Sequence, residues 1–241
     1  MGKTHFFLSG KGGIGKSFAA FLLAQYYLSR GKIVQCIDTD PMGTGIVKYD
    51  ALGTKHIDIL CEDPTSPNSM KSLFNTIQST DKDGEIVIDC SNTSFLTMCR
   101  SLKENDYMDE IVTYGKMPFL HSVIVGGAAC KETLSSFKAL MDNFPNVPVV
   151  VWLNDYFGDI RIDGETFEHT RFFKDYVDRI RGIVQFGPSR NEVLKYDVNR
   201  MLADRLTFKE ATTTSNYFII TKSRLRMGWR KLDTKISQLN I

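Results

Sequence analysis

The chain has 241 residues, of which 42% are hydrophobic, and its 30 basic and 28 acidic side chains leave a formal net charge of +2 at pH 7. A nearly neutral chain gives no whole-molecule attraction to nucleic acid, and its apolar runs are of strand length, well short of the roughly 20 residues that cross a bilayer. The size and composition instead suit one domain over residues 1–241, and five cysteines without a C-x-x-C spacing indicate reduced thiols in a cytoplasmic protein.

The first predicted strand, at residues 6–8, leads into a glycine-rich segment of the form G-x-x-x-x-G-K-[ST]. Such a loop lets successive backbone N–H groups surround an anion, and a helix predicted over residues 17–28 directs the positive end of its dipole at the same anion. This context indicates a phosphate-binding loop, in which Lys16 contacts the β- and γ-phosphates and the Ser17 hydroxyl ligates Mg²⁺. The alternative is a glycine-rich strand-to-helix turn that holds no ligand. The residues predicted to bind nucleotide here are Gly10, Lys11, Gly12, Gly13, Ile14, Gly15, Lys16, Ser17 and Phe18.

Acidic residues follow the next buried strands. A strand predicted at residues 33–37 leads into Asp38 and Asp40, and a second at residues 85–89 ends in Asp89. Because open α/β sheets bind ligands at the carboxyl ends of their strands, we expect these carboxylates at the rim of the phosphate site. Two plainer interpretations stay open: Asp89 caps the following helix, and the D-x-D-P segment is an ordinary turn.

Strands and helices alternate along the chain. Strand-like runs lie near residues 5, 33, 57, 85, 120, 148 and 183, and helical stretches lie near residues 17, 68, 94, 131, 169 and 190. This rhythm predicts an α/β fold, doubly wound, with a mostly parallel sheet and helices on both faces. Residues 38–50 and 154–165 are longer irregular segments that follow strand ends, so they are candidate loops over the nucleotide.

The C-terminal end is basic. Residues 205–241 hold eight lysines and arginines against two acids, a local net charge of +6. Five large apolar residues with 4-3-4-3 spacing predict an amphipathic helix at about residues 217–240: Leu225, Trp229, Leu232, Ile236 and Leu239. Three roles stay open for it: a helix that packs its apolar stripe on its own domain, a nonspecific DNA-binding element, and a membrane-surface helix.

The phosphate loop carries an additional lysine, and its K-G-G-x-G-K-[ST] form resembles the deviant Walker A motif of the ParA/MinD superfamily. This resemblance implies that Lys11 reaches across a nucleotide-sandwich dimer to the partner's phosphates; the alternative is that Lys11 only neutralises its own nucleotide. Blocks beyond the loop, including residues 149–158 and 206–211, are similar to the TraL proteins of conjugative plasmids, and this likeness spans about residues 3–211.

The superfamily resemblance assigns roles to several of these residues. It implies that Lys11, Lys16 and Asp40 are catalytic, with Asp40 orienting the attacking water. It also implies that Ser17, Asp38 and Asp89 hold Mg²⁺, with Asp89 acting through water.

A base pocket is implied in the same way. Asn154 closes a predicted strand and resembles the family residue that hydrogen-bonds the adenine edge; a turn residue that holds the strand end is the alternative. Pro188 is similar in place to a residue on the other side of the adenine. The residues after Asn154 do not form the N-K-x-D arrangement of guanine-specific proteins, so ATP is favoured over GTP.

These resemblances imply a nucleotide-switched ATPase with weak Mg²⁺-dependent hydrolysis, acting in plasmid conjugal transfer or maintenance. The expected partners are a second copy in an ATP-dependent homodimer, an unidentified plasmid transfer or partition protein, and DNA or a membrane surface at the basic helix. A cytoplasmic location, peripheral to the nucleoid or the inner membrane, follows. The alternatives are a partition ATPase and a metabolic P-loop enzyme of the dethiobiotin synthetase kind, which would need neither Lys11 nor the basic tail.

Two departures from the partition ATPases concern the hydrolysis switch. Residues 90–94 replace their D-x-x-P-G-like segment, and Met42 replaces their glutamine. We therefore expect the coupling of hydrolysis to a partner protein to be altered.

Overall fold

The computed structural model describes residues 1–60, 69–187 and 191–241. Within these ranges, a sheet of seven parallel strands has the order β3-β2-β4-β1-β5-β6-β9. The predicted α/β fold with a doubly wound parallel sheet is thereby confirmed. The strands are β1 Lys3–Phe7, β2 Val34–Asp38, β3 Lys55–His56, β4 Glu85–Asp89, β5 Met117–Val125, β6 Val149–Asn154 and β9 Ile180–Phe186.

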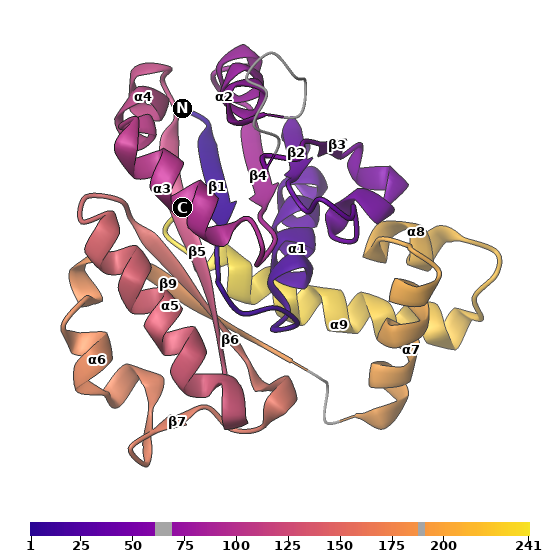
Figure 1. The fold of residues 1–241 in the computed structure, drawn as a ribbon. Helices are drawn as coiled ribbons and strands as arrows, with labels where there is room; N and C mark the ends of the chain where they lie inside the picture. The colour runs from indigo at the N-terminus through magenta and orange to yellow at the C-terminus, as the bar shows by residue number, and fades with distance from the viewer. Residues whose placement is uncertain (61–68, 188–190) are drawn as a thin grey trace.

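Helices cover both faces of this sheet (Figure 1). Neighbouring residues of a strand point to opposite faces, so Phe6 packs in one core cluster and Phe7 in the other. The first cluster lies under α2, α3, α4, α5 and α6, and the second under α1, α7, α8 and α9. The helices are α1 Lys16–Ser29, α2 Met70–Ser79, α3 Phe95–Glu104, α4 Tyr107–Thr113, α5 Cys130–Asn143, α6 Arg171–Lys174, α7 Glu192–Ala203, α8 Phe208–Thr213 and α9 Ile219–Ser237.

The segments expected to be irregular contain short elements. Residues 38–50 include the 3₁₀ helix η1, Ile46–Lys48, and residues 154–165 include η4, Asp155–Phe157, and most of the hairpin formed by β7, Arg161–Ile162, and β8, Glu165–Thr166. The helices α4 and α8 were not predicted either. These elements are shorter than the window of roughly 11 to 18 residues in which hydrophobic periodicity is recognised. The remaining 3₁₀ helices are η2 Asp50–Leu52, η3 Gly127–Ala129, η5 Phe167–His169 and η6 Val177–Arg179.

The apolar stripe of the C-terminal helix α9 belongs to the core. Leu225 and Ile236 are fully buried, and Leu239 is 8% exposed. Trp229 and Leu232 pack partly buried on the same cluster, with the Trp229 ring centred 5.2 Å from that of Phe208. Of the three roles left open for this helix, the structure favours internal packing for the stripe, so a membrane role in which Trp229 and its neighbours insert is incompatible with this burial. No helix in the described ranges is long and apolar enough to cross a membrane.

A buried polar cluster lies in the middle of the sheet, and we name it the histidine network: His5, His121, Trp152 and Tyr27. The Trp152 indole donates to His121 Nδ1 over 2.9 Å, and His121 Nε2 lies 2.8 Å from His5 Nδ1. His5 Nε2 lies 2.9 Å from the Tyr27 hydroxyl. Because an indole N–H can only donate, neutral His121 must carry its proton on Nε2 and donate to His5, which then donates to Tyr27.

Candidate functional site

A cavity of about 300 Å³ opens at the carboxyl ends of the central strands. This volume is at the lower end of the range of small-molecule sites. One wall is the phosphate loop between β1 and α1, and the other comes from the segments that follow β2 and β4. The lining residues are Lys11, Gly12, Gly13, Gly15, Lys16, Ser17, Phe18, Asp40, Thr44, Lys48, Asp89, Ser91 and Asn92.

The loop backbone has the conformation that anion binding requires. Gly13 and Gly15 have φ values of 72° and 91°, in the left-handed region that favours glycine. Gly13 faces open space, since a Cβ there would meet no atom within 4 Å. The first turn of α1 contains no acidic side chain and has no side-chain cap, so its N–H groups are available to an anion. The loop therefore fits a nucleotide phosphate.

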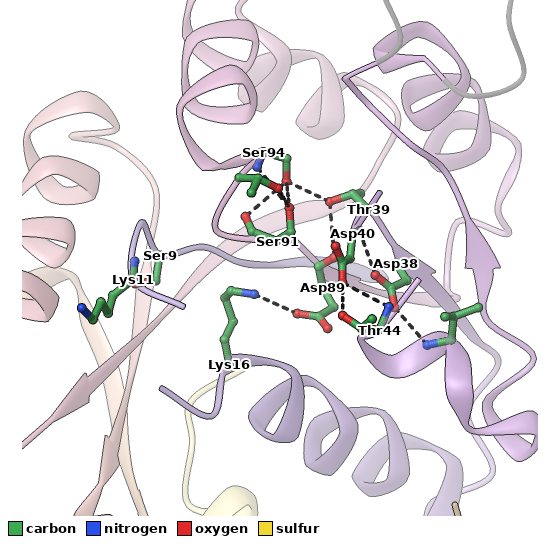
Figure 2. A network of polar contacts seen from close by, with 12 residues as sticks. Ser9, Lys11, Lys16, Asp38, Thr39, Asp40, Thr44, Asp89, Ser91 and Ser94 are labelled. Carbon is green, nitrogen blue, oxygen red and sulfur yellow. Dashed lines mark hydrogen bonds and ion pairs between the residues drawn. The ribbon is translucent and has the colours of Figure 1, made fainter. Parts of the chain in front are cut away.

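Lys16 and Asp89 form a buried ion pair at the base of this cavity (Figure 2). Lys16 Nζ lies 3.3 Å from Asp89 Oδ1, and the two side chains are 9% and 2% exposed. Asp89 is the last residue of β4, and it pairs with Phe7 at the end of β1, so sheet register alone brings the acid beside the loop. The sequence prediction that Asp89 lies at the phosphate site agrees with this geometry.

Asp38 lies behind the cavity wall and fixes the segment after β2. Its Oδ1 accepts the N–H of Asp40 over 2.9 Å, and its Oδ2 accepts the N–H of Val47 over 3.0 Å. A Cβ on Gly45 would lie 2.5 Å from a carboxylate oxygen of Asp38 and 2.5 Å from one of Asp89, so only glycine fits between them. Burial raises the pKa of Asp38 above its ordinary value, and the charge of Asp89 adds to this, while the two N–H groups oppose it.

Asp40 lies nearer to solvent and closes the turn that follows it. Its carboxylate accepts the N–H of Met42 over 3.2 Å, the N–H of Thr44 over 3.1 Å and the Thr44 hydroxyl. The pKa of Asp40 is lowered: partial burial acts to raise it, but the hydrogen bonds from Thr44 and Met42 and the charge of Lys16 outweigh burial. Asp40 is therefore an ionised carboxylate at neutral pH.

Hydroxyl groups connect the segments after β2 and β4. Ser91 Oγ lies 2.9 Å from Ser94 Oγ and 2.8 Å from Thr93 Oγ1, and Ser94 Oγ lies 3.4 Å from Thr39 Oγ1. The Thr39 N–H donates to the carbonyl of Asp89 over 2.9 Å. The polar run that replaces the partition-ATPase pattern thus links the two acid-bearing segments, with Ser91 in the cavity wall.

Lys11 points away from Lys16 and the acids (Figure 2). Its ammonium lies 2.8 Å from Glu132 Oε2 in α5, and both side chains are substantially exposed. Lys11 and Gly10 also line a neighbouring groove that includes Phe95, Leu96 and Ser135. In this structure the additional lysine is therefore paired within its own chain.

Asn154 contacts the phosphate loop and lies outside the cavity lining. Its Nδ2 donates to the Ile14 carbonyl over 2.9 Å, and its Oδ1 accepts the N–H of Tyr156 over 3.1 Å. The side chain thus holds both the loop and the turn after β6. The predicted adenine contact of Asn154 stays a prediction, and Pro188 lies outside the described residues.

The structure brings most of the predicted site residues to one place. Gly12, Gly13, Gly15, Lys16, Ser17, Phe18, Asp40 and Asp89 line the cavity together with Lys11. Gly10 lines the adjacent groove, the Ile14 side chain is 2% exposed and packs in the core, and Asp38 supports the wall from behind. The residues that the sequence analysis did not assign are Thr44, Lys48, Ser91 and Asn92. Their position just after β2 and β4 was the only signal that could have found them.

Comparisons with known proteins identify the family of this chain. The CobQ/CobB/MinD/ParA nucleotide binding domain matches residues 5–184. The chain is 34% identical over 233 residues to a Protein TraL of Escherichia coli, covering 96% of each, and 34% identical over 228 residues to a second Protein TraL of that organism, covering 94% of each. Among solved structures, the MinD cell division protein of Aquifex aeolicus is 16% identical, with a TM-score of 0.44 over 94% of this chain and 97% of that one. The chain therefore belongs to the CobQ/CobB/MinD/ParA nucleotide-binding family and is similar to the TraL proteins along nearly its whole length.

Proposed function

We propose that this protein is an ATP-switched ATPase that acts in the transfer or maintenance of a plasmid. The observation that carries the proposal is the buried ammonium of Lys16, which faces both Asp89 and a cavity edged by left-handed glycines. The family relationship supports a nucleotide-hydrolysing enzyme, and the similarity to TraL proteins supports the plasmid setting.

Nucleotide binding at this site is an exchange of partners by Lys16 and Asp89. ATP with Mg²⁺ supplies the phosphoanhydride bond and a cation that neutralises the developing charge. On binding, Lys16 would turn from Asp89 to the β- and γ-phosphates, and Asp89 and the Ser17 hydroxyl would hold Mg²⁺, with Asp89 acting through water. The exchange leaves neither buried charge unpaired, which matters because breaking a buried pair costs about 3–5 kcal/mol.

Asp40 and Asp38 have different roles in the segment after β2. Asp40, which is ionised and lines the cavity, orients the attacking water. Asp38, behind the cavity wall, would help to organise the Mg²⁺ and its waters beside Asp89 with the lone pairs that the two backbone N–H groups leave free. Neither carboxylate is a strong base, so turnover is slow and depends on positioning.

Lys11 acts between two copies of the chain. Its contact with Glu132 is exposed, and exposed ion pairs are worth at most about 1 kcal/mol, so Lys11 leaves Glu132 readily for a partner's phosphate. ATP then stabilises a homodimer, and hydrolysis releases it. This dimer is the state that a plasmid transfer or partition protein recognises.

The basic face of α9 is the proposed surface for DNA or an anionic membrane. Arg226, Arg230 and Lys231 are exposed. Arg224 is committed elsewhere, because its Nη2 donates to the buried Asp197 over 3.2 Å. Replacing the three exposed cations by Ala should weaken DNA binding and flatten its salt dependence, by about 0.9 in the logarithmic slope per contact, at an unchanged melting temperature. If the parent binds neither DNA nor vesicles in any nucleotide state, the proposed role of this surface is wrong.

The proposed ATP site is tested with Lys16→Ala. We expect ATP affinity in the presence of Mg²⁺ to fall by about a hundredfold or more, because the main side-chain cation for the phosphates is lost. Calorimetric titration measures the affinity, a melt confirms that the variant folds, and Lys32→Ala is the control because Lys32 is exposed in the turn after α1. Unchanged affinity in folded Lys16→Ala would overturn the site.

The dimer is tested by light scattering with ADP, ATP and a slowly hydrolysed ATP analogue. The parent should dimerise with the analogue and not with ADP. Lys11→Ala should keep ATP binding and lose the dimer. Equal dimer formation by the parent and Lys11→Ala would remove the proposed role of Lys11.

A further inference from the structure

Lys48 is a cation of the cavity wall that neither the motif nor the family resemblance accounts for. Three lysines line the cavity: Lys11, Lys16 and Lys48. Lys16 is paired with Asp89 and Lys11 with Glu132. Among the described residues Lys48 has no carboxylate partner, and its ammonium lies 5.4 Å from the centre of the Tyr49 ring. An ammonium group that lines a cavity without a counter-charge favours an anion there.

The backbone that carries Lys48 is fixed on both sides. The N–H of Val47 donates to the buried Asp38 carboxylate over 3.0 Å. The Tyr49 ring is 5% exposed, and its centroid lies 4.2 Å from that of Phe21 in α1. Lys48 therefore presents an exposed side chain from an anchored segment, so little backbone ordering is needed when it meets a ligand.

The order of the strands indicates which part of a nucleotide this wall faces. The phosphate loop follows β1, with β4 and β2 on one side and β5, β6 and β9 on the other. Asn154 of β6 and Phe186 of β9 lie against the loop at Gly15, and neither carries a charge. The charged groups Asp40, Asp89 and Lys48 lie on the opposite side. A nucleotide with its base toward β6 and β9 therefore directs its terminal phosphate toward Lys48.

We propose that Lys48 binds the terminal phosphate of ATP within the same chain and makes the site discriminate ATP from ADP. This inference rests on the proposed function. Asp40 and Thr44 share the wall with Lys48, so the same segment holds the attacking water and senses the phosphate that is lost on hydrolysis. Loss of that phosphate removes the anion that Lys48 contacts, which couples the nucleotide state to the segment after β2.

The test measures two affinities by calorimetric titration in Mg²⁺: that of ADP and that of the slowly hydrolysed analogue AMPPNP. Lys48→Met should bind AMPPNP about tenfold more weakly than the parent does, because one charge-assisted contact is lost, and should bind ADP within about twofold of the parent. Lys48→Arg should retain most of the preference for AMPPNP. Lys32→Met, which removes an exposed lysine far from the cavity, should match the parent.

The outcomes separate this inference from the proposed function. Equal affinities of the parent and Lys48→Met for AMPPNP, or an equal loss for AMPPNP and ADP, would overturn the inference while the proposed function stands. A parent that binds neither nucleotide would overturn both. A melt distinguishes folding from binding, and an exposed Lys48 should leave the melting temperature of the Met variant unchanged.

Discussion

The nucleotide cavity and the histidine network both place polar groups deep in the protein, yet their partners differ in kind. At the cavity the groups are charged, and Lys16 and Asp89 hold each other next to open space. In the histidine network the groups are neutral, buried and hydrogen-bonded to one another in a linear chain from Trp152 to Tyr27. Strand β1 serves both, since it carries His5 in its middle and leads into the phosphate loop.

This difference separates two uses of buried polarity. A charged pair beside a cavity can exchange its partner for a ligand without leaving a bare charge, so it suits binding. A neutral network whose members hydrogen-bond one another inside the core is costly to break, so it fixes the packing of β1, β5, β6 and α1. Substitutions in the histidine network should therefore change stability, and those at the cavity should change binding or turnover.

The largest effect is expected for Trp152→Ala. Trp152 is fully buried, and its removal leaves a cavity and an unpaired His121 Nδ1. The free energy of unfolding should fall by about 3–5 kcal/mol, while the ATP affinity of the folded protein stays at the parent value. Urea denaturation measures the first and titration calorimetry the second. Trp152→Phe, which mainly removes the donor, should lose less, about 1–3 kcal/mol. A Trp152→Ala variant that loses ATP affinity but keeps the stability of the parent would contradict a purely structural role of the histidine network.

A comparable loss of stability should accompany acidification. Burial lowers the pKa of His5 well below its ordinary value of 6.5, with the neighbouring His121 adding to this, and burial lowers the pKa of His121 to about 3. Between pH 6.5 and pH 3 the unfolded chain therefore binds more protons than the native protein, so stability falls as the pH falls. At pH 5 the cost is about 2 kcal/mol for His121, and His5 adds to it in the same direction.

Urea denaturation at pH 7.5 and pH 5.0 measures this loss. The raised pKa of Asp38 acts in the opposite direction, because below its folded value the native carboxyl binds the additional proton. Equal stability at the two pH values, or protonated ring signals for all four histidines by NMR at pH 5, would contradict the neutral histidine network.

At the cavity, Asp40→Ala should slow ATP turnover by about a hundredfold, equivalent to about 2.7 kcal/mol, and should leave ATP binding nearly intact. The physical reason is the loss of the carboxylate that we propose orients the attacking water. Asp40→Asn is the matched variant, because it removes the charge and keeps one acceptor oxygen, enough for the N–H group of either Met42 or Thr44. If both variants turn over at the parent rate, another group orients the water.

The smallest effect is expected for Glu132→Gln, at the exposed ion pair with Lys11. Freeing Lys11 from an exposed pair should favour the ATP-dependent dimer by less than about 1 kcal/mol, which is at most about a fivefold lower dissociation constant. Light scattering at several protein concentrations with AMPPNP measures it, with Lys138→Gln as a control at another exposed pair. A weaker dimer would show that Glu132 supports the dimer and does not restrain Lys11.

Much of the fold followed from local patterns. Six strands of the parallel sheet lie where an apolar run predicted them, and the short polar strand β3 lies beside the strand-like run near residue 57. The phosphate loop and α1 follow from the glycines and the lysine at residues 10–17. Strands buried on both faces read as continuous apolar runs, and a phosphate loop has a strict residue spacing, so both are visible in a short window. The short helices α4 and α8 were missed because each is shorter than the sequence window in which helical periodicity is recognised.

Sequence by itself determined that a glycine-rich loop of the phosphate-binding pattern follows the first strand and that acids end two neighbouring strands, because these features depend on neighbouring residues. Tertiary structure alone decided which side chains share the cavity and which pair elsewhere. Lys48 lines the cavity because its segment returns to Asp38. Arg224 is not free to bind DNA because Asp197 of α7 pairs with it. The apolar stripe of α9 is part of the core because α8 and the sheet lie beneath it. Each of these depends on the distance between residues far apart along the chain, which chain packing sets and no local pattern encodes.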